Sequence, residues 1–299
     1  MIMNRLSVDS GFSGIPNIKY YYVFLFLLFI VSVMGNTVVM VIICLDQNLR
    51  APKYITVFNL AFTDLFGSSA LLPKVLDIFL FDHPCISYND CLTFLFFFYT
   101  CFPMQALNLV VLAYDRMIAI IFQLHYHVKV THRFMFSLIA SSWLFDITVT
   151  LTAVGLLTRH SYWTSVVINS FFCDYGQIYR LACDDKTPSF VFSALLTVLI
   201  YGLPLVFIVS VMFFHERVKA FKTCIAHLSL VAIFFFPLIT AITSTGVIHP
   251  NARIINLSLT SAFPPSLNPV IYVLQTKEIK ESVKKLFKLR KQSKIAVKI

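Results

Sequence analysis

The stretch that decides the fold is Leu112–Ile121, LAYDRMIAII, which closes a long apolar run of the chain. An acid and a base, Asp115 and Arg116, stand side by side where roughly 20 membrane-length residues stop. Because charge is costly in hydrocarbon, the pair belongs at the inner membrane edge or inside a helix bundle. Two interpretations stay open here. The pair either marks where a span ends, or forms a switch in which Asp115 restrains Arg116 until a partner protein binds it.

The chain as a whole has the composition of a membrane protein. Of its 299 residues, 58% are hydrophobic and only 13% are charged, whereas soluble domains carry about a quarter charged residues. Lipid satisfies no backbone polar group, so bilayer-spanning helices explain the repeated apolar runs. The net charge of +10 is concentrated in a few segments, which argues against nucleic-acid binding. Residues 1–19 lack the short apolar core of a cleavable signal peptide.

Seven apolar runs follow one another with no soluble domain between them. We therefore predict an all-α membrane protein, in which residues 1–299 form a single domain built as a bundle of seven transmembrane helices. The predicted spans cover residues of about 20–45, 54–80, 91–122, 134–157, 190–214, 224–245 and 254–274. After the last span, apolar residues recur near helical spacing among lysines, which predicts a short amphipathic helix at about 277–290 on the inner leaflet.

Basic residues predict the orientation of the bundle. If the C-terminus lies inside, the inner segments hold 17 Lys and Arg and the outer segments hold 6. Cytoplasmic segments carry the excess of Lys and Arg in membrane proteins. We expect an extracellular N-terminus and a cytoplasmic C-terminus.

Several polar residues stand inside the apolar runs, where an unpaired polar group is costly. They are Asn36, Asp64, Gln105, Asn108, Asn268 and Tyr272. Together they predict a hydrogen-bonded cluster around one carboxylate, which could hold a monovalent cation or a proton and could equally serve a transporter. The fourth span also carries an unexpected acid, Asp146. We predict no structural metal site and no cofactor.

Five motifs, in the right order along the chain, carry a specific resemblance. Gly35-Asn36 resembles the first-span GN of rhodopsin-like receptors, and Leu60–Lys74 (LAFTDLFGSSALLPK) is similar to their second-span LSFxD…PK. LAYDRMIAI resembles the olfactory MAYDRYVAI. Lys219–Leu228 (KAFKTCIAHL) is similar to KAFSTCxSHL, and Pro264–Val283 resembles PPxLNPIIYxLRTKEIR. The chain therefore resembles a vertebrate olfactory receptor of the fish type, within the rhodopsin-like G-protein-coupled receptors.

This resemblance implies an odorant receptor of the plasma membrane, and not an enzyme. Such a receptor binds small odorant molecules within the bundle and activates a heterotrimeric G protein with an olfactory or stimulatory α-subunit, raising cyclic AMP; membrane lipids are the remaining partners. The switch residues that the resemblance implies are Asp115, Arg116, Asn268, Pro269 and Tyr272. The sodium-linked cluster of the family would be Asn36, Asp64, Gln105 and Asn268.

Aromatic residues predict where the ligand binds. Phe98, Tyr99 and Phe102 recur at roughly helical spacing in the third span, and Phe235 precedes a helix-bending proline, Pro237. The predicted ligand-binding residues are Phe98, Tyr99, Phe102, Phe235, Ile239 and Ser261. Any one of these aromatics could instead pack helix on helix.

The cysteines and one short segment depart from the family pattern. The resemblance implies a Cys91–Cys173 disulfide, but Cys183 lacks its usual partner and Cys85 is the only nearby substitute, so a Cys85–Cys183 bridge stays open. The segment Ser210–Lys219 is shorter than the family's fifth-span exit and third inner loop. A receptor allele with impaired coupling is therefore one alternative.

Other classes are less well supported by the residues. A non-olfactory rhodopsin-like receptor is the main alternative, although an amine receptor would want an acid in the outer half of the third span, where the sequence reads FYTCF at 98–102. A small transporter is a distant alternative, since we find no internal repeat. The motifs HExxH, the phosphate-binding Gly-rich loop and the nucleophile elbow are all absent, which disfavours an enzyme.

Overall fold

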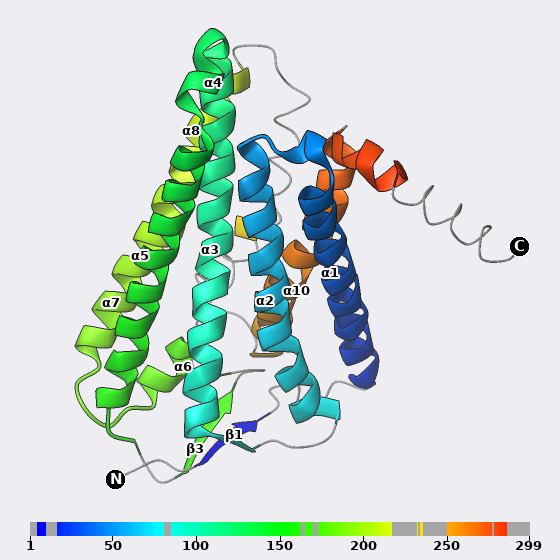
Figure 1. Ribbon diagram of the computed structural model, residues 1–299. Coiled ribbons are helices and arrows are strands. Elements are labelled where there is room, and N and C mark those ends of the chain that lie inside the picture. The colour runs from blue at the N-terminus through cyan, green and yellow to red at the C-terminus, as the bar shows by residue number, and fades with distance from the viewer. Residues whose placement is uncertain are drawn as a thin grey trace, which may run out of the picture.

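Long helices lying side by side make up most of the molecule (Figure 1). The computed structural model describes residues 5–9, 17–80, 85–162, 165–169, 173–216, 232, 234–235, 250–276 and 278–285. Its long helices are α1 (Lys19–Leu45), α2 (Lys53–Leu80), α3 (Tyr88–Ile121), α5 (His132–Arg159), α7 (Thr187–Thr197), α8 (Leu203–Glu216) and α10 (Pro250–Gln275). Short helical elements connect or extend them: η1 (Gln47–Leu49), η2 (Gln123–His125), α4 (Tyr126–Lys129), α6 (Tyr175–Arg180) and η3 (Val198–Gly202).

These helices confirm the predicted fold class. A helical segment, 278–285, follows α10 as the predicted short helix after the last span, and we call it the tail segment. Within the described residues, α1, α3, α5 and the α7–α8 stretch are each long and apolar enough to cross a membrane, by length and composition. Most of the predicted sixth span, 224–245, lies outside the described residues.

Helix α3 is the centre of the bundle. It contacts α2, α5 and α8, whereas α1 packs on α2 and α10 at the side (Figure 1). In its most apolar window 67% of the residues are buried, against 22% for α1. Most of this window of α3 is covered by neighbouring helices, so polar groups on its buried side must find their partners within the protein.

Capping explains where two of the helices begin. Ser87 precedes α3, and its Oγ accepts a hydrogen bond from the backbone N–H of Asp90 (3.1 Å). Thr131 precedes α5 in the same way, with its Oγ1 accepting from the N–H of Phe134 (3.2 Å). Because these side chains satisfy N–H groups that have no partner within the helix, both helices start before the apolar run itself starts.

A small sheet lies at the end of the bundle where the chain begins (Figure 1). Strand β1 (Arg5–Asp9) pairs antiparallel with β2 (Cys85–Ser87) and parallel with β3 (Ser165–Asn169), giving the order β2-β1-β3. The sheet joins the N-terminal segment to the connections that precede α3 and follow α5. Sequence analysis did not predict it.

Candidate functional site

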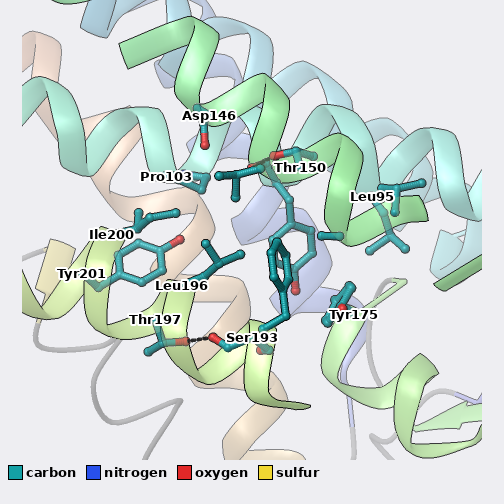
Figure 2. Close-up of a pocket in the computed structure, with 15 residues that line it drawn as sticks. Leu95, Pro103, Asp146, Thr150, Tyr175, Ser193, Leu196, Thr197, Ile200 and Tyr201 are labelled. Atoms are coloured by element: carbon teal, nitrogen blue, oxygen red, sulfur yellow. Dashed lines mark hydrogen bonds between the residues drawn. The ribbon is translucent and has the colours of Figure 1, made fainter. Parts of the chain in front are cut away.

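A cavity of about 90 Å³ lies between α3, α5, α7 and η3 (Figure 2). Its wall is mostly aliphatic and aromatic, with Leu95 and Tyr99 from α3, Ala153 from α5 and Leu196 from α7. Tyr175 of α6 also lines it. The cavity is therefore a small, largely apolar space of the kind that binds small organic molecules.

A π-helical turn shapes one wall of this cavity. Pro204 has no backbone N–H and its ring crowds the carbonyl of Ile200, four residues earlier. The chain responds by widening into η3, where the N–H of Leu203 bonds to the carbonyl of Val198. This wider turn presents both Ile200 and Tyr201 to the cavity (Figure 2).

A disulfide and two hydrogen bonds fix the cavity's wall near the sheet. Cys91 of α3 and Cys173 form the disulfide that the family resemblance implied, with 5.7 Å between their Cα atoms. The next residue, Asp174, accepts a hydrogen bond from the Tyr99 hydroxyl at its Oδ1 (3.0 Å). Thr150 of α5 donates to the backbone carbonyl of Tyr99 (2.9 Å). Tyr99 is thus held from two sides while its ring faces the cavity.

Of the predicted ligand-binding residues that the structure describes, only Tyr99 lines this cavity. The rings of Phe98 and Phe102 stack along α3 at 5.4 Å, and Phe102 contacts Phe234 at 5.2 Å. Phe235 is buried against Phe234. These aromatics form a continuous packed row, which we call the aromatic row, and whether ligand also reaches them stays a prediction.

The other two predicted ligand-binding residues give less information. Ser261 is buried in α10, where its hydroxyl donates to the carbonyl of Leu257 (2.8 Å). Ile239 lies outside the described residues. Cys183 is free and exposed in the described structure. Because the side chain of Cys85 is not described, the second disulfide stays a prediction.

The buried acid of α2 forms the centre of the predicted polar cluster. Asp64 is fully buried, and its Oδ2 accepts a hydrogen bond from Asn268 of α10 (2.7 Å). Gln105 of α3 also interacts with this carboxylate. Among the described residues, Asp64 Oδ1 and Gln105 Oε1 have no hydrogen-bond partner. Two buried oxygens without a donor fit a monovalent cation such as sodium, whose charge Asp64 and Gln105 would contact from α2 and α3.

Asn36 was predicted to belong to the cluster around Asp64, but its hydrogen bonds lead elsewhere. Its side-chain amide donates to the carbonyl of Pro265 (2.9 Å) and to that of Ser32 (2.9 Å), and no described hydrogen bond joins it to Asp64. Pro269 has no N–H, so the carbonyl of Pro265, four residues earlier, has no intrahelical partner. Asn36 supplies the missing donor, so it joins α1 to α10.

Close packing accompanies this hydrogen bond. A Cβ placed on Gly35 would lie 2.9 Å from both Cβ and Cγ of Pro269. Only glycine lets α1 approach the proline ring this closely. Gly35-Asn36 of α1 and Pro265–Pro269 of α10 therefore pack against each other in one contact between the two helices.

A second polar chain links α2, α3 and α5. Asn59 donates through Nδ2 to Asn108 Oδ1 (2.7 Å) and accepts from the indole N–H of Trp143 (2.9 Å). The amide of Asn108 in turn reaches the hydroxyl of Thr63 (3.5 Å). Sequence analysis placed Asn108 in the polar cluster but missed Asn59 and the role of Trp143.

At the other end of the bundle, Asp115 and Arg116 have separate surroundings. Asp115 is 1% exposed, and its Oδ1 accepts a hydrogen bond from the hydroxyl of Tyr126 in α4 (2.7 Å). No ion pair joins Asp115 to Arg116 among the described side chains, which differs from the direct restraint expected from sequence. Arg116 Nε has no described hydrogen-bond partner, and the guanidinium instead interacts electrostatically with Tyr272 and Glu278.

The tail segment is fixed to the same end of the bundle. Ser282 donates to Asp46 Oδ2, at the end of α1 (2.5 Å), and Lys53 of α2 pairs with Glu278 (3.4 Å). The Ser282 hydroxyl is the main cause that lowers the pKa of Asp46, with the backbone N–H of Asn48 adding to it. The first turn of α2 and the end of α1 therefore hold the tail segment near Arg116.

Comparisons with known proteins agree with this architecture. A family model described as "Olfactory receptor" matches residues 25–290. Olfactory receptor 1E16 of Mus musculus is 31% identical over 285 residues, covering 91% of each chain. Olfactory receptor 6B1 of Homo sapiens is 32% identical over 289 residues, covering 92% of each chain.

A solved structure shows the same fold. Squid rhodopsin matches with a TM-score of 0.74 at 16% sequence identity, over 95% of this chain and 91% of that one. The family model spans most of the chain, and curated relatives more than 30% identical cover nine-tenths of it. This chain belongs to the olfactory receptor family of rhodopsin-like G-protein-coupled receptors.

Proposed function

We propose that this receptor binds small odorant molecules within the helix bundle and activates a heterotrimeric G protein with a stimulatory or olfactory α-subunit, which raises cyclic AMP. The observation that carries this proposal is the mostly apolar cavity between α3, α5, α7 and η3, within a helix bundle of the receptor family (Figure 2). An apolar wall with a few polar groups suits small organic ligands better than ions or peptides.

Ring contacts connect this cavity to the aromatic row. Tyr201 lines the cavity and contacts Phe102 at 6.3 Å between ring centroids. Phe102 in turn contacts Phe234, whose neighbour Phe235 was predicted to bind ligand. A ligand that moves Tyr201 would therefore shift the packing of residues 234–235 against α3. We propose that Phe98, Tyr99, Phe102, Phe235, Ile239 and Ser261 respond to ligand in this way, directly or through ring contacts.

The opposite end of the bundle carries the proposed coupling residues. Arg116 is half-buried, and its charge acts electrostatically on Tyr272, which follows the Asn268-Pro269 step of α10 in sequence. A partner that offers backbone carbonyls to the guanidinium would favour the bundle conformation in which Arg116 is accessible. Ligand and G protein would then bias the same equilibrium from opposite ends.

Orientation and location follow from charge. We propose a plasma-membrane protein with the seven spans given above, an extracellular N-terminus and a cytoplasmic C-terminus, supported by the excess of Lys and Arg on one side. The tail helix, at about 277–290, would lie against lipid headgroups. We also propose a fish-type receptor, which identities of only 30–32% to mammalian relatives allow.

A cell assay tests the proposal. Cells that express the receptor with an N-terminal epitope are labelled without permeabilisation and then exposed to a panel of small odorants while cyclic AMP is recorded. Surface labelling and a rise in cyclic AMP are expected. Surface labelling without a rise in cyclic AMP for any odorant would favour the coupling-impaired receptor that the short Ser210–Lys219 segment suggested. Labelling of the N-terminal epitope only after permeabilisation would reverse the orientation.

A further inference from the structure

The cavity contains an acid that the family resemblance does not explain. Asp146 lies in α5, is 0% exposed, and lines the cavity. Neither of its carboxylate oxygens has a hydrogen-bond partner among the described residues. The cavity wall contains no Lys, Arg or His in the described part of the chain. A buried carboxylate without a cation or donor is costly, and the described residues supply neither to Asp146.

The neighbouring hydroxyl groups are arranged to accept hydrogen bonds. Thr150 lies one helical turn after Asp146, on the same face of α5, and its proton is already donated to the carbonyl of Tyr99 (2.9 Å). Thr197 likewise donates to the carbonyl of Ser193 (2.9 Å), as Figure 2 shows. What these two hydroxyls still offer the cavity is oxygen lone pairs. The wall also carries the hydroxyls of Tyr175 and Tyr201, which can donate or accept. A carboxylate among these acceptor and hydroxyl oxygens suits a ligand that brings several donors.

We infer that the cavity binds a small organic ammonium compound, with its charged nitrogen at Asp146 and its hydrocarbon part against Leu95 and Leu196. A protonated primary amine has three N–H donors and a positive charge, which match the carboxylate and the acceptor hydroxyls. In Figure 2 the Asp146 side chain points toward Pro103, and Tyr201 lies beyond it; all three residues line the cavity. This ligand class rests on the proposed function, in which the chain is a receptor for small molecules.

The size of the cavity limits the ligand. Its volume of about 90 Å³ is smaller than the roughly 150 Å³ of an engineered cavity that holds benzene. Isobutylammonium, with a short branched chain, is a suitable probe. Isobutanol has nearly the same shape without the charge, and sodium has the charge without the hydrocarbon part.

The test measures binding without a G protein. The full-length receptor is placed in lipid nanodiscs, and its thermal unfolding is followed by circular dichroism during titration with isobutylammonium chloride, isobutanol or sodium chloride. Isobutylammonium should raise the unfolding midpoint of the wild type, whereas Asp146→Asn should need at least tenfold more of it for the same rise. Asp90→Asn removes an equal charge from an exposed site on α3 and should respond like the wild type.

A second variant covers the case in which Asp146→Asn does not fold. Ala153→Phe keeps the carboxylate but fills the cavity, and it should abolish the response to isobutylammonium. The inference is overturned if isobutanol stabilises the receptor as strongly as the amine, if Asp146→Asn responds to the amine like the wild type, or if the amine produces no rise. Sodium can also stabilise the receptor at Asp64, so a sodium chloride response counts against the inference only if Asp146→Asn removes it and it is as large as that of the amine. Because cyclic AMP is not measured here, these outcomes are distinct from a failure of G-protein coupling.

Discussion

The contact between Gly35 and Pro269 makes a prediction whose size can be worked out from the structure. In Gly35→Ala, the new methyl carbon would lie 2.9 Å from two carbons of the proline ring, whereas carbon atoms in contact prefer about 3.5–4.0 Å. A proline ring cannot rotate away, so α1 and α10 must separate by several tenths of an ångström. That movement also stretches the 2.9 Å hydrogen bond from Asn36 to the carbonyl of Pro265.

Two effects therefore add in this variant. Overpacking of a tight contact costs about 1–3 kcal/mol, and a weakened buried hydrogen bond costs roughly 1 kcal/mol more. The helix propensity gained by replacing glycine with alanine offsets about 0.5–1 kcal/mol of this cost. We expect Gly35→Ala to lower the free energy of unfolding by roughly 1–3.5 kcal/mol, the sum of these terms.

A matched control separates packing from propensity. Gly155, in α5, has no atom within 4 Å of an added Cβ, so Gly155→Ala should gain only the propensity term. Thermal unfolding of both variants in nanodiscs gives the comparison. If Gly35→Ala is as stable as Gly155→Ala, close approach of α1 to Pro269 does not explain the first-span glycine.

Two further predictions concern the end of the bundle that carries Asp115. Tyr126→Phe removes the 2.7 Å hydrogen bond to this carboxylate, which is worth about 1.5–3 kcal/mol for a charged acceptor. The variant should therefore raise the cyclic AMP level without ligand about tenfold or more. The control variant Tyr114→Phe should not raise it, and equal signalling in both variants would contradict the prediction. The Ser282 hydroxyl lowers the pKa of Asp46 below its ordinary 3.8, which means that the folded state favours the ionised carboxylate. The contact therefore stabilises the tail segment fully above about pH 3.8. This stabilisation is lost as the pH falls through the lower, folded-state pKa. Energy transfer between dyes on α1 and on the tail segment should therefore fall only below about pH 3.8, and Ser282→Ala should remove this fall. A fall in energy transfer near neutral pH would refute the role given to the contact between Asp46 and Ser282.

The fold class could be predicted because it depends on local composition. Long apolar runs have one stable arrangement in lipid, so the helices follow from the sequence directly. Their starting points do not, because Ser87 and Thr131 set them through single hydrogen bonds. The small sheet was missed because β1 and β3 are 160 residues apart in sequence, and no local pattern indicates that two such distant segments pair.

The sequence predicted those contacts of the site whose residues belong to recognisable motifs. The motif resemblance brought Asp64 and Asn268 together, and the structure joins them by a hydrogen bond. It did not indicate that Asn36 would bond to α10 instead, because that depends on the carbonyl freed by Pro269. Asp146 stood out in the sequence as an acid in a span, but its role required knowing which face of α5 meets the π turn.

The central claim is that this chain is a receptor that signals when a ligand binds. Measuring the signalling of an Arg116 variant tests this claim most directly. Cells expressing wild type, Arg116→Ala or Arg133→Ala are matched for surface epitope and exposed to an odorant panel that includes isobutylamine, while cyclic AMP is recorded. Arg133 is an exposed arginine in the first turn of α5, so its loss controls for charge. We predict that Arg116→Ala abolishes the response and that Arg133→Ala keeps it. An undiminished response in Arg116→Ala would mean that the charge pair only marks the end of a membrane span, and would contradict the account.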